Sequence, residues 1–292
     1  LNIDIETVAM EATGVYWVIL YDILEEAGLD VWLVDGRETK QVPGRKTDVK
    51  DCQWIHELHS HGMLNRCFVA GEDIKELRSY LRLREDHIRS SSMHINHMQK
   101  ALTEMNLRLK EVLSQIHGTS GMKMIKAILK GERNSKVLLG MCDSRIIKNK
   151  GAEVLKALSG RYTNAGLFAL QQAHDAYYFY QNQISQCDKE IERIIHRMGK
   201  GNKDKDLSTK RKAIRHNKPQ VKDLGANLIN VFDGRDATVI SGITDYTWMQ
   251  LLSETGTDLT RWPNEKKFTS WLGLAPGQHW SGKMRKKKKK KG

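Results

Sequence analysis

Residues 7–35 read TVAMEATGVYWVILYDILEEAGLDVWLVD, and this stretch decides the fold class of the N-terminal part. Its first five residues are a short apolar strand candidate, followed by a turn-prone A-T-G. The helix after the turn stops at Gly28, and DVWLVD is a nearly continuous apolar run, as expected in a covered parallel sheet. Strand, helix and strand at this spacing predict a βαβ unit. One face of the helix carries the apolar residues Val15, Ile19, Leu20, Ile23, Leu24 and Ala27.

Two longer stretches predict a coiled coil. Across residues 74–116, apolar residues recur three and four positions apart, and only Arg84 and Ser91 interrupt the pattern. Residues 170–198 keep the same alternation without a gap. Such sustained spacing is typical of a coiled-coil seam, so we expect the two helices to pair as an antiparallel hairpin. Cys187 then has a sufficient role as a seam residue.

The composition divides the chain into four parts of an α/β plus α fold. After the second seam, the sequence becomes basic, poor in apolar residues and punctuated by Gly and Pro, which is typical of a linker. Beyond it, VISGITDYTWMQLLSETG predicts a turn followed by a helix, and FTSWLGLAPG predicts a second short helix. The expected parts are a partial α/β domain (1–70), a coiled-coil helical region (71–198), a basic linker (199–222) and a C-terminal domain with a basic tail (223–292).

The chain is basic, with a net charge of +13, of which Arg285 and the lysines at 286–291 supply seven charges. This excess predicts a polyanionic partner, most often nucleic acid, although a solvated polylysine end is the simpler alternative. The four cysteines lie far apart without a C-x-x-C pair, which argues against a zinc knuckle or a disulfide framework. No apolar run approaches the roughly 18 to 20 residues that span a bilayer, and no signal peptide opens the chain. We therefore expect a cytoplasmic protein.

Three carboxylates are candidate metal ligands. Glu11 closes the first strand, so we expect it at the carboxyl edge of the sheet, where the sites of open α/β sheets lie. Asp48 and Asp51, in GRKTDVKD, are one turn apart at a helix start and can face the same point. Carboxylates are the ligands of hard divalent cations, which can activate a hydroxyl and stabilise a phosphate in flight. In the structural alternative, Asp48 caps the helix and Asp51 complements the helix dipole.

Two sets of motifs resemble a known family. In the first set, E-A-T-G-V-Y is followed by K-T-D-V-K-D. In the second, the S-G-I-T turn is followed by F-T-S-W-L-G-L-A-P and then by the serine and glycine of HWSGK. In this order the motifs resemble the transposases of the insertion-sequence family called one-ten, which are the DEDD transposases or bridge-RNA-guided recombinases. The resemblance covers nearly the whole chain.

The resemblance implies a RuvC-like (ribonuclease-H-like) domain, a coiled-coil insertion and a C-terminal transposase domain. It implies a homo-oligomeric enzyme of the prokaryotic nucleoid that cleaves and rejoins DNA with Mg²⁺ or Mn²⁺, guided by an element-encoded RNA. Glu11, Asp48 and Asp51 match the second, third and fourth acids of the DEDD set, and Ser281 matches the serine that attacks the DNA phosphate. The nearby cations expected to hold nucleic-acid backbones are Arg45, Lys46, Lys50, Lys283 and Arg285.

The sequence departs from the family pattern in two places. The first DEDD aspartate of the family lies several tens of residues before the glutamate, and Asp4 is too near Glu11 to serve. The chain also stops soon after Ser281, where the family continues. We therefore expect a truncated and catalytically weak or inactive chain. Two alternatives stay open: a metal-dependent nuclease of RuvC type, and a non-catalytic coiled-coil remnant that binds nucleic acid.

Overall fold

The computed structural model describes residues 5–39, 48–199 and 211–273. Within these ranges the protein is mostly helical, with one small parallel sheet of two strands. None of the described helices combines the length and the apolar character that crossing a membrane requires. The chain divides into two compact units, residues 1–71 and residues 72–292. The predicted α/β part lies in the first unit, and the two long helices lie in the second.

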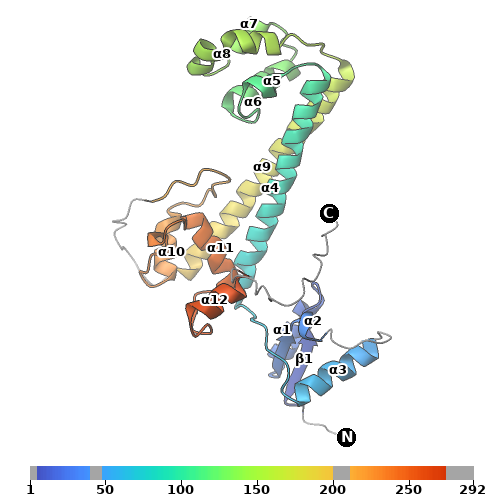
Figure 1. Cartoon of the computed structure of the whole chain (residues 1–292), viewed down its shortest axis with the longest axis vertical. Coiled ribbons are helices and arrows are strands. Elements are labelled where there is room, and N and C mark those ends of the chain that lie inside the picture. Colours follow the sequence, from blue (N-terminus) through green and yellow to red (C-terminus); the bar gives the residue numbers. More distant parts are fainter. Residues whose placement is uncertain (1–4, 40–47, 200–210, 274–292) are drawn as a thin grey trace, which may run out of the picture. The chain divides into compact units, whose positions relative to one another are not determined.

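The first unit is a βαβ unit extended by two helices (Figure 1). Its elements are strand β1 (Thr7–Glu11), helix α1 (Trp17–Glu26), strand β2 (Asp30–Val34), helix α2 (Gly36–Thr39) and helix α3 (Asp48–Ser60). The strands are parallel, with Thr7 opposite Asp30 and Glu11 opposite Val34. After α1, Gly28 adopts a φ of 82°, which glycine tolerates without strain and which ends the helix. The predicted βαβ unit is confirmed.

Different helices cover the two faces of the sheet. On one face, Tyr21 of α1 packs against β2, and on the other face Leu58 of α3 packs with Val34. Alternate residues of a strand point to opposite faces, and the side chains of β1 follow this rule. Met10 packs in the cluster of Tyr21, whereas Ala9 packs in the cluster of Leu58.

The apolar face of α1 is largely uncovered by the described residues. Tyr21 is buried, whereas Val15, Ile19 and Ile23 are 76%, 72% and 56% exposed. Two neighbouring strands lie only about 5 Å apart, while a helix with its side chains is about 10 Å wide. The described strands therefore cover only the side chains of α1 that point directly at them.

Two long helices, α4 (Glu72–Glu104) and α9 (Asn164–Met198), lie side by side in the second unit (Figure 1). They are antiparallel, because α4 residues of increasing number meet α9 residues of decreasing number. The prediction that the first helix continues to residue 116 is wrong. Asn106 adopts a left-handed φ of 58°, a conformation that a right-handed helix cannot contain, and α4 ends just before it.

The two positions that interrupt the apolar pattern of α4 make buried polar contacts. Arg84 and Asp188 are each 1% exposed, and Arg84 Nε donates to Asp188 Oδ1 at 2.6 Å. Further along α4, Gln181 Nε2 donates to Ser91 Oγ at 2.8 Å. Arg84 also donates to the Tyr246 hydroxyl at 3.2 Å. The side chains of Arg84 and Ser91 therefore bond α4 to α9, and Arg84 also bonds α4 to α11.

Residues 105–163 connect α4 to α9 and form a helical domain at their adjoining ends (Figure 1). We call this domain the tip domain. Its helices are α5 (Leu109–Val112), α6 (Thr119–Leu129), α7 (Ser135–Leu139) and α8 (Ser144–Ala157). Ile125 and Ile128 of α6 are fully buried in a core shared with the adjoining ends of α4 and α9. Leu109 and Ile116, which the sequence places on the continuing seam, are buried in this core instead.

The described residues 211–273 of the second unit contain four short helices. They are α10 (Leu224–Val231), the 3-10 helix η1 (Ala237–Val239), α11 (Asp245–Thr255) and α12 (Glu265–Trp271). The predicted turn before α11 is present: Gly242 has a φ of 86°, and Thr244 caps the helix by accepting from the Thr247 N–H. α11 packs on α4, where Arg78 Nε donates to the Ser253 carbonyl at 2.9 Å.

Candidate active site

Glu11 is the last residue of β1, opposite Val34. It follows Ala9 by two positions, and residues two apart in a strand point to the same face. Because Ala9 packs in the cluster of α3, the Glu11 side chain lies on the face of the sheet that α3 covers. The half-buried carboxylate thus stands at the carboxyl edge of the sheet.

Two threonines hold the Glu11 carboxylate. Thr13 Oγ1 donates to Oε1 at 2.7 Å, and Thr39 Oγ1 donates to Oε2 at 3.0 Å. Gly36 permits this packing, because a Cβ at that position would stand 2.5 Å from Glu11 Oε1. A carboxylate oxygen has two lone pairs, so it can accept more than one bond. The sequence interpretation missed these supports, although Thr13 belongs to the A-T-G that follows the glutamate.

Helix α3 runs back along the sheet, from the level of Glu11 toward the start of β1. Near the C-terminal end of the helix, His59 Nε2 lies 2.8 Å from Thr7 Oγ1 at the start of β1. In the middle of the helix, Trp54 Nε1 donates to the Thr39 carbonyl at 3.1 Å. Thr39 therefore joins α3 through its backbone to Glu11 through its side chain.

The rise of the two elements indicates where the first turn of α3 lies. From Thr7 to Glu11 a strand rises about 13 Å, and from His59 to Asp51 a helix rises about 12 Å. Since His59 is paired with Thr7, Asp51 reaches about the same level along the strand direction as Glu11. Asp51 is half-buried, whereas Asp48, which begins the helix, is exposed.

Among the residues that the structure describes, no three His, Cys, Asp or Glu side chains lie close enough together to hold a metal ion. The structure therefore brings Glu11, Asp48 and Asp51 to neighbouring elements but does not bring them together as a ligand set. Their chemistry fits a hard divalent cation, because all three offer carboxylate oxygens. Residues 40–47, which join α2 to α3, lie outside the described residues.

Lys50 is exposed in the first turn of α3, between the two aspartates. A helix N-terminus favours Asp48 and Asp51 and disfavours a cation, each by a few tenths of a kcal/mol. Helix stability thus accounts for both acids as first-turn residues, although Asp48 begins the helix instead of capping it, but it does not account for Lys50. The remaining predicted site residues lie outside the described ranges: Arg45, Lys46, Ser281, Lys283 and Arg285.

A second polar cluster holds the turn before α11. Lys212 Nζ donates to the Thr238 carbonyl at 2.7 Å. Arg211 donates to Asp236 at 2.9 Å and lies 3.3 Å from Asp245 Oδ1. Burial raises the pKa of the Asp245 carboxyl above its usual range; the Arg211 charge opposes this rise and the Asp236 charge adds to it. These contacts fix the turn that the sequence predicts before α11.

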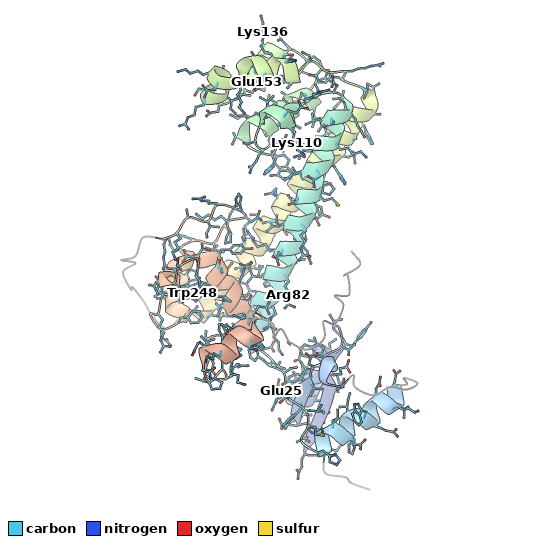
Figure 2. The ribbon with its side chains drawn as sticks, in the orientation of Figure 1. Glu25, Arg82, Lys110, Lys136, Glu153 and Trp248 are labelled. Carbon is cyan, nitrogen blue, oxygen red and sulfur yellow. The ribbon has the colours of Figure 1, made fainter. Side chains whose placement is uncertain are left out.

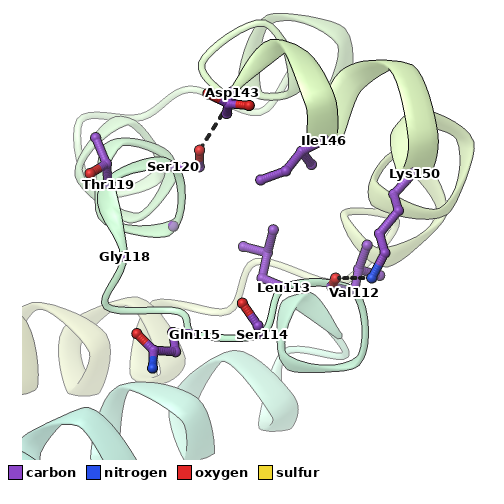
Figure 3. A pocket seen from close by; sticks show the side chains of 11 residues that line it. Val112, Leu113, Ser114, Gln115, Gly118, Thr119, Ser120, Asp143, Ile146 and Lys150 are labelled. Atoms are coloured by element: carbon purple, nitrogen blue, oxygen red, sulfur yellow. Dashed lines mark hydrogen bonds between the residues drawn. The ribbon is translucent and has the colours of Figure 1, made fainter. Parts of the chain in front are cut away.

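The tip domain contains a cavity of about 400 Å³ (Figure 3). Lys150 Nζ donates to the Val112 carbonyl at 3.0 Å beside the cavity, and the Ser120 hydroxyl accepts from the Asp143 N–H at 3.0 Å. None of the predicted site residues lines this cavity. Its lining comprises Val112, Leu113, Ser114, Gln115, Gly118, Thr119, Ser120, Gly121, Asp143, Ile146 and Lys150.

Comparison with known proteins gives two matches to families. Residues 4–107 match a family model for IS110 DEDD enzymes that is described as Transposase. Residues 237–292 match a second family model, described as Transposase IS116/IS110/IS902 family. The first match includes the three candidate carboxylates, and the second includes Ser281. Neither the curated proteins nor the solved structures yield a match.

Proposed function

Because this chain belongs to the IS116/IS110/IS902 family of transposases, we propose that it cleaves and rejoins DNA with Ser281 as nucleophile and Glu11, Asp48 and Asp51 as metal ligands. One observation carries the assignment of the carboxylates. Glu11 stands at the carboxyl edge of the sheet on the face covered by α3, and Thr39 joins it to that helix. The first turn of α3 thereby faces the edge at which Glu11 is held.

A divalent cation is implied by the DEDD family, and Mg²⁺ or Mn²⁺ suits an all-carboxylate set. When bound, the cation would supply charge neutralisation at the phosphate and make a nearby hydroxyl more acidic. The threonine hydroxyls of Thr13 and Thr39 orient the Glu11 carboxylate for this purpose. Lys50, with Arg45 and Lys46, would hold the phosphate backbone beside the acids.

The chemistry proposed for Ser281 is a pair of transesterifications. The serine oxygen attacks the DNA phosphorus, a phosphoserine ester forms, and the broken P–O bond releases a strand end that takes up a proton as a hydroxyl. A hydroxyl of the recipient strand then attacks the phosphoserine, which restores the serine and joins the strands. A serine hydroxyl is a weak nucleophile at neutral pH and needs help to lose its proton. A cation held by the three carboxylates would make that hydroxyl more acidic.

Transposases bind DNA, and the proposal adds three finer features. An element-encoded RNA selects the target by base pairing, Lys283 and Arg285 hold nucleic-acid backbone beside Ser281, and the active form is a homo-oligomer. The basic composition of the chain supports backbone binding, since phosphate contacts supply most of the sequence-independent affinity for nucleic acids.

The test is covalent capture of DNA by the full chain. The chain is incubated with labelled duplex carrying element ends, the cognate RNA and Mg²⁺, and the products are separated on a denaturing gel. An active chain gives a protein-linked DNA band that disappears in Ser281→Ala, in Asp48→Asn and on chelation of the metal, whereas the weak or inactive chain that the missing first aspartate predicts gives little or none. Glu72→Gln is the matched control for Asp48→Asn, because Glu72 is also a first-turn acid of a helix.

The alternatives give different results in the same assay. Metal-dependent cleavage that survives Ser281→Ala without a covalent band would identify a hydrolytic nuclease of RuvC type. Binding without metal-dependent cleavage would identify a non-catalytic nucleic-acid-binding protein. Gly36→Ala tests the support of Glu11, since its Cβ would displace the carboxylate, and Gly71→Ala is the control because open space surrounds that position. A covalent band unchanged by Asp48→Asn would refute the assignment of the carboxylates.

A further inference from the structure

The positive charge of the chain is concentrated in the tip domain, residues 105–163. This domain contains twelve lysines and arginines against four acids, a net charge of +8. The C-terminal run 285–291 supplies a further +7, and everything else carries a net charge of −2. The folded tip domain is therefore the source of the basic character that the chain has outside its C-terminal run.

All twelve cations of the tip domain are exposed, and two helices arrange them in rows. Lys123 and Lys126 of α6 and Lys130, its C-cap residue, are spaced three and four residues apart, so they share one face opposite buried Ile125 and Ile128. We call these three lysines the α6 row. Figure 2 shows side chains, among them Lys110 and Lys136, projecting from this domain. The second row, on α8, consists of Arg145, Lys148 and Lys156.

Three of the four acids of the tip domain are used within its own fold. The fourth, Glu153, is exposed on α8. Asp143 caps α8 by accepting from the Arg145 N–H at 3.0 Å, and Glu132 accepts from the N–H groups that precede α7. Glu111 lies 3.8 Å from Arg108. Among the described residues, no acid pairs with the three lysines of the α6 row. Their charge is therefore available to a partner.

The side chains of the tip domain favour a duplex over a single strand. Proteins that hold single-stranded nucleic acids stack bases on exposed aromatic rings. The tip domain has one tyrosine and no Phe or Trp. That residue, Tyr162, is half-buried, with Arg133 over its ring at 4.5 Å and its hydroxyl donating to the Leu158 carbonyl. A row of lysines without a stacking surface fits the phosphates of a double helix.

We propose that the tip domain binds the sugar-phosphate backbone of duplex DNA without reading its sequence. The choice of DNA as the duplex rests on the proposed function. Residues 84–104 of α4 span about 30 Å. The tip contact is thus separate from any contact of the C-terminal helices, which join α4 at Arg84. It would hold DNA at a distance from these helices.

The experiment measures binding of a labelled random-sequence duplex DNA to the full chain by fluorescence anisotropy at several salt concentrations. The test variant replaces Lys123, Lys126 and Lys130 with Gln. The matched control replaces three exposed cations of the long helices, Arg89, Lys100 and Lys189, with Gln and so makes the same change in net charge. Both variants keep the C-terminal lysines, so the contribution of these lysines to DNA affinity cancels when the two variants are compared.

We expect the log–log dependence of affinity on salt to become shallower by about 0.9 for each phosphate that the test variant no longer neutralises, and affinity to fall about tenfold or more. The control should change both quantities much less. Because the α6 variant could fold poorly, its circular dichroism is compared with that of the parent chain. The triple Gln variant of the α8 row, Arg145, Lys148 and Lys156, repeats the test on a second helix.

The proposal is overturned if well-folded α6 and α8 variants match the control on duplex DNA. It is also overturned if they lose affinity for duplex RNA or for single-stranded RNA but not for duplex DNA. The outcome is independent of the covalent product, because anisotropy follows binding of the duplex and not its cleavage. Absence of that product in every variant would refute the proposed function and leave the tip result standing.

Discussion

Arg84 and Asp188 form a buried ion pair in the contact between α4 and α9. A buried pair of this kind adds little net stability compared with apolar residues, because removing both charges from water costs about as much as their attraction returns. The remaining bonds are satisfied by protein groups: Asp188 Oδ2 accepts from the Gln220 N–H at 3.0 Å, and Arg84 reaches Tyr246 and the Asn217 carbonyl. The pair therefore specifies the alignment of four segments of chain.

Removing one member of this pair should be costly. Arg84→Met leaves the Asp188 carboxylate buried without its cation, and we expect the free energy of unfolding to fall by about 3 to 5 kcal/mol. Arg82→Ala, two residues away, removes an exposed pair with Glu254 and should cost less than about 1 kcal/mol. Urea titrations of both variants measure the difference.

The double variant Arg84→Met/Asp188→Leu should recover part of the stability lost by Arg84→Met, since it leaves no unpaired charge in the interface. Equal losses in Arg82→Ala and Arg84→Met would show that the pair is not buried in solution.

At the scale of elements, the middle of the hairpin is aromatic and polar. His94 of α4 stacks on Tyr180 of α9 with ring centroids 5.5 Å apart, and His97 lies 5.4 Å from His94. Burial lowers the pKa of His94, and the neighbouring His97 lowers it further. Its Nδ1 is buried without a hydrogen-bond partner among the described residues. The hairpin therefore prefers the neutral imidazole.

The sign of the pH dependence follows from this preference. As the pH falls below the ordinary histidine value of 6.5, the unfolded chain binds a proton at this position before the folded chain does. Stability is thus fully present well above that pH and is lost as the pH falls. We expect the urea midpoint to be lower at about pH 5 than at about pH 8, and His94→Gln to reduce that difference.

His196→Gln is the control for the pH measurement, because His196 is exposed near the end of α9. Many carboxylates also contribute to the overall dependence, so the informative quantity is the change in the pH difference between the two variants. If the urea midpoint changes with pH by the same amount in His94→Gln and in His196→Gln, His94 does not contribute to the pH dependence.

For the whole molecule, the two units differ in the size of their described cores. The first unit has two small clusters, centred on Tyr21 and on Leu58. The second has a continuous cluster that joins the tip domain to both long helices. Since buried apolar area is the main source of stability, at about 25 cal/mol per Å², the first unit should be the less stable one.

Hydrogen exchange measures this difference directly. Under native conditions we expect the backbone amides of β2 to exchange faster than those of α6 and of the central turns of α9, because the first unit opens independently of the second. The amides of α12 are an internal reference, since that helix has no buried residue among those described. Equal protection of β2 and α6 would show that the two units open together.

Much of the local structure could be predicted from the sequence. The apolar run at β2 and the stop at Gly28 identify a βαβ unit, because both signals depend on neighbours within a few residues. The end of α4 could not be predicted in this way, since the apolar spacing continues past Asn106 while the backbone turns. The same side chains satisfy either arrangement: Leu109 is buried in the tip domain instead of in a seam.

The sequence could indicate which residues belong to the candidate site, but not how they contact one another in three dimensions. Glu11 and the pair Asp48 and Asp51 are visible as motifs, whereas the support from Thr39 depends on α2, which brings that residue next to the end of β1. The basic surface of the tip domain went unnoticed, because its cations are spread over the helices and connections of the domain without a motif. Only their common exposure on one folded domain makes them a surface.

By itself, the sequence determined the βαβ unit, the two long amphipathic helices and the order of the transposase motifs, since periodicity and motif spacing are short-range properties of a chain. The tertiary structure decided that Arg84 meets Asp188 and that Glu11 shares a face of the sheet with α3. Contacts between segments far apart in sequence depend on which surfaces exclude water together. That selection is made by burial, which acts on the folded chain as a whole.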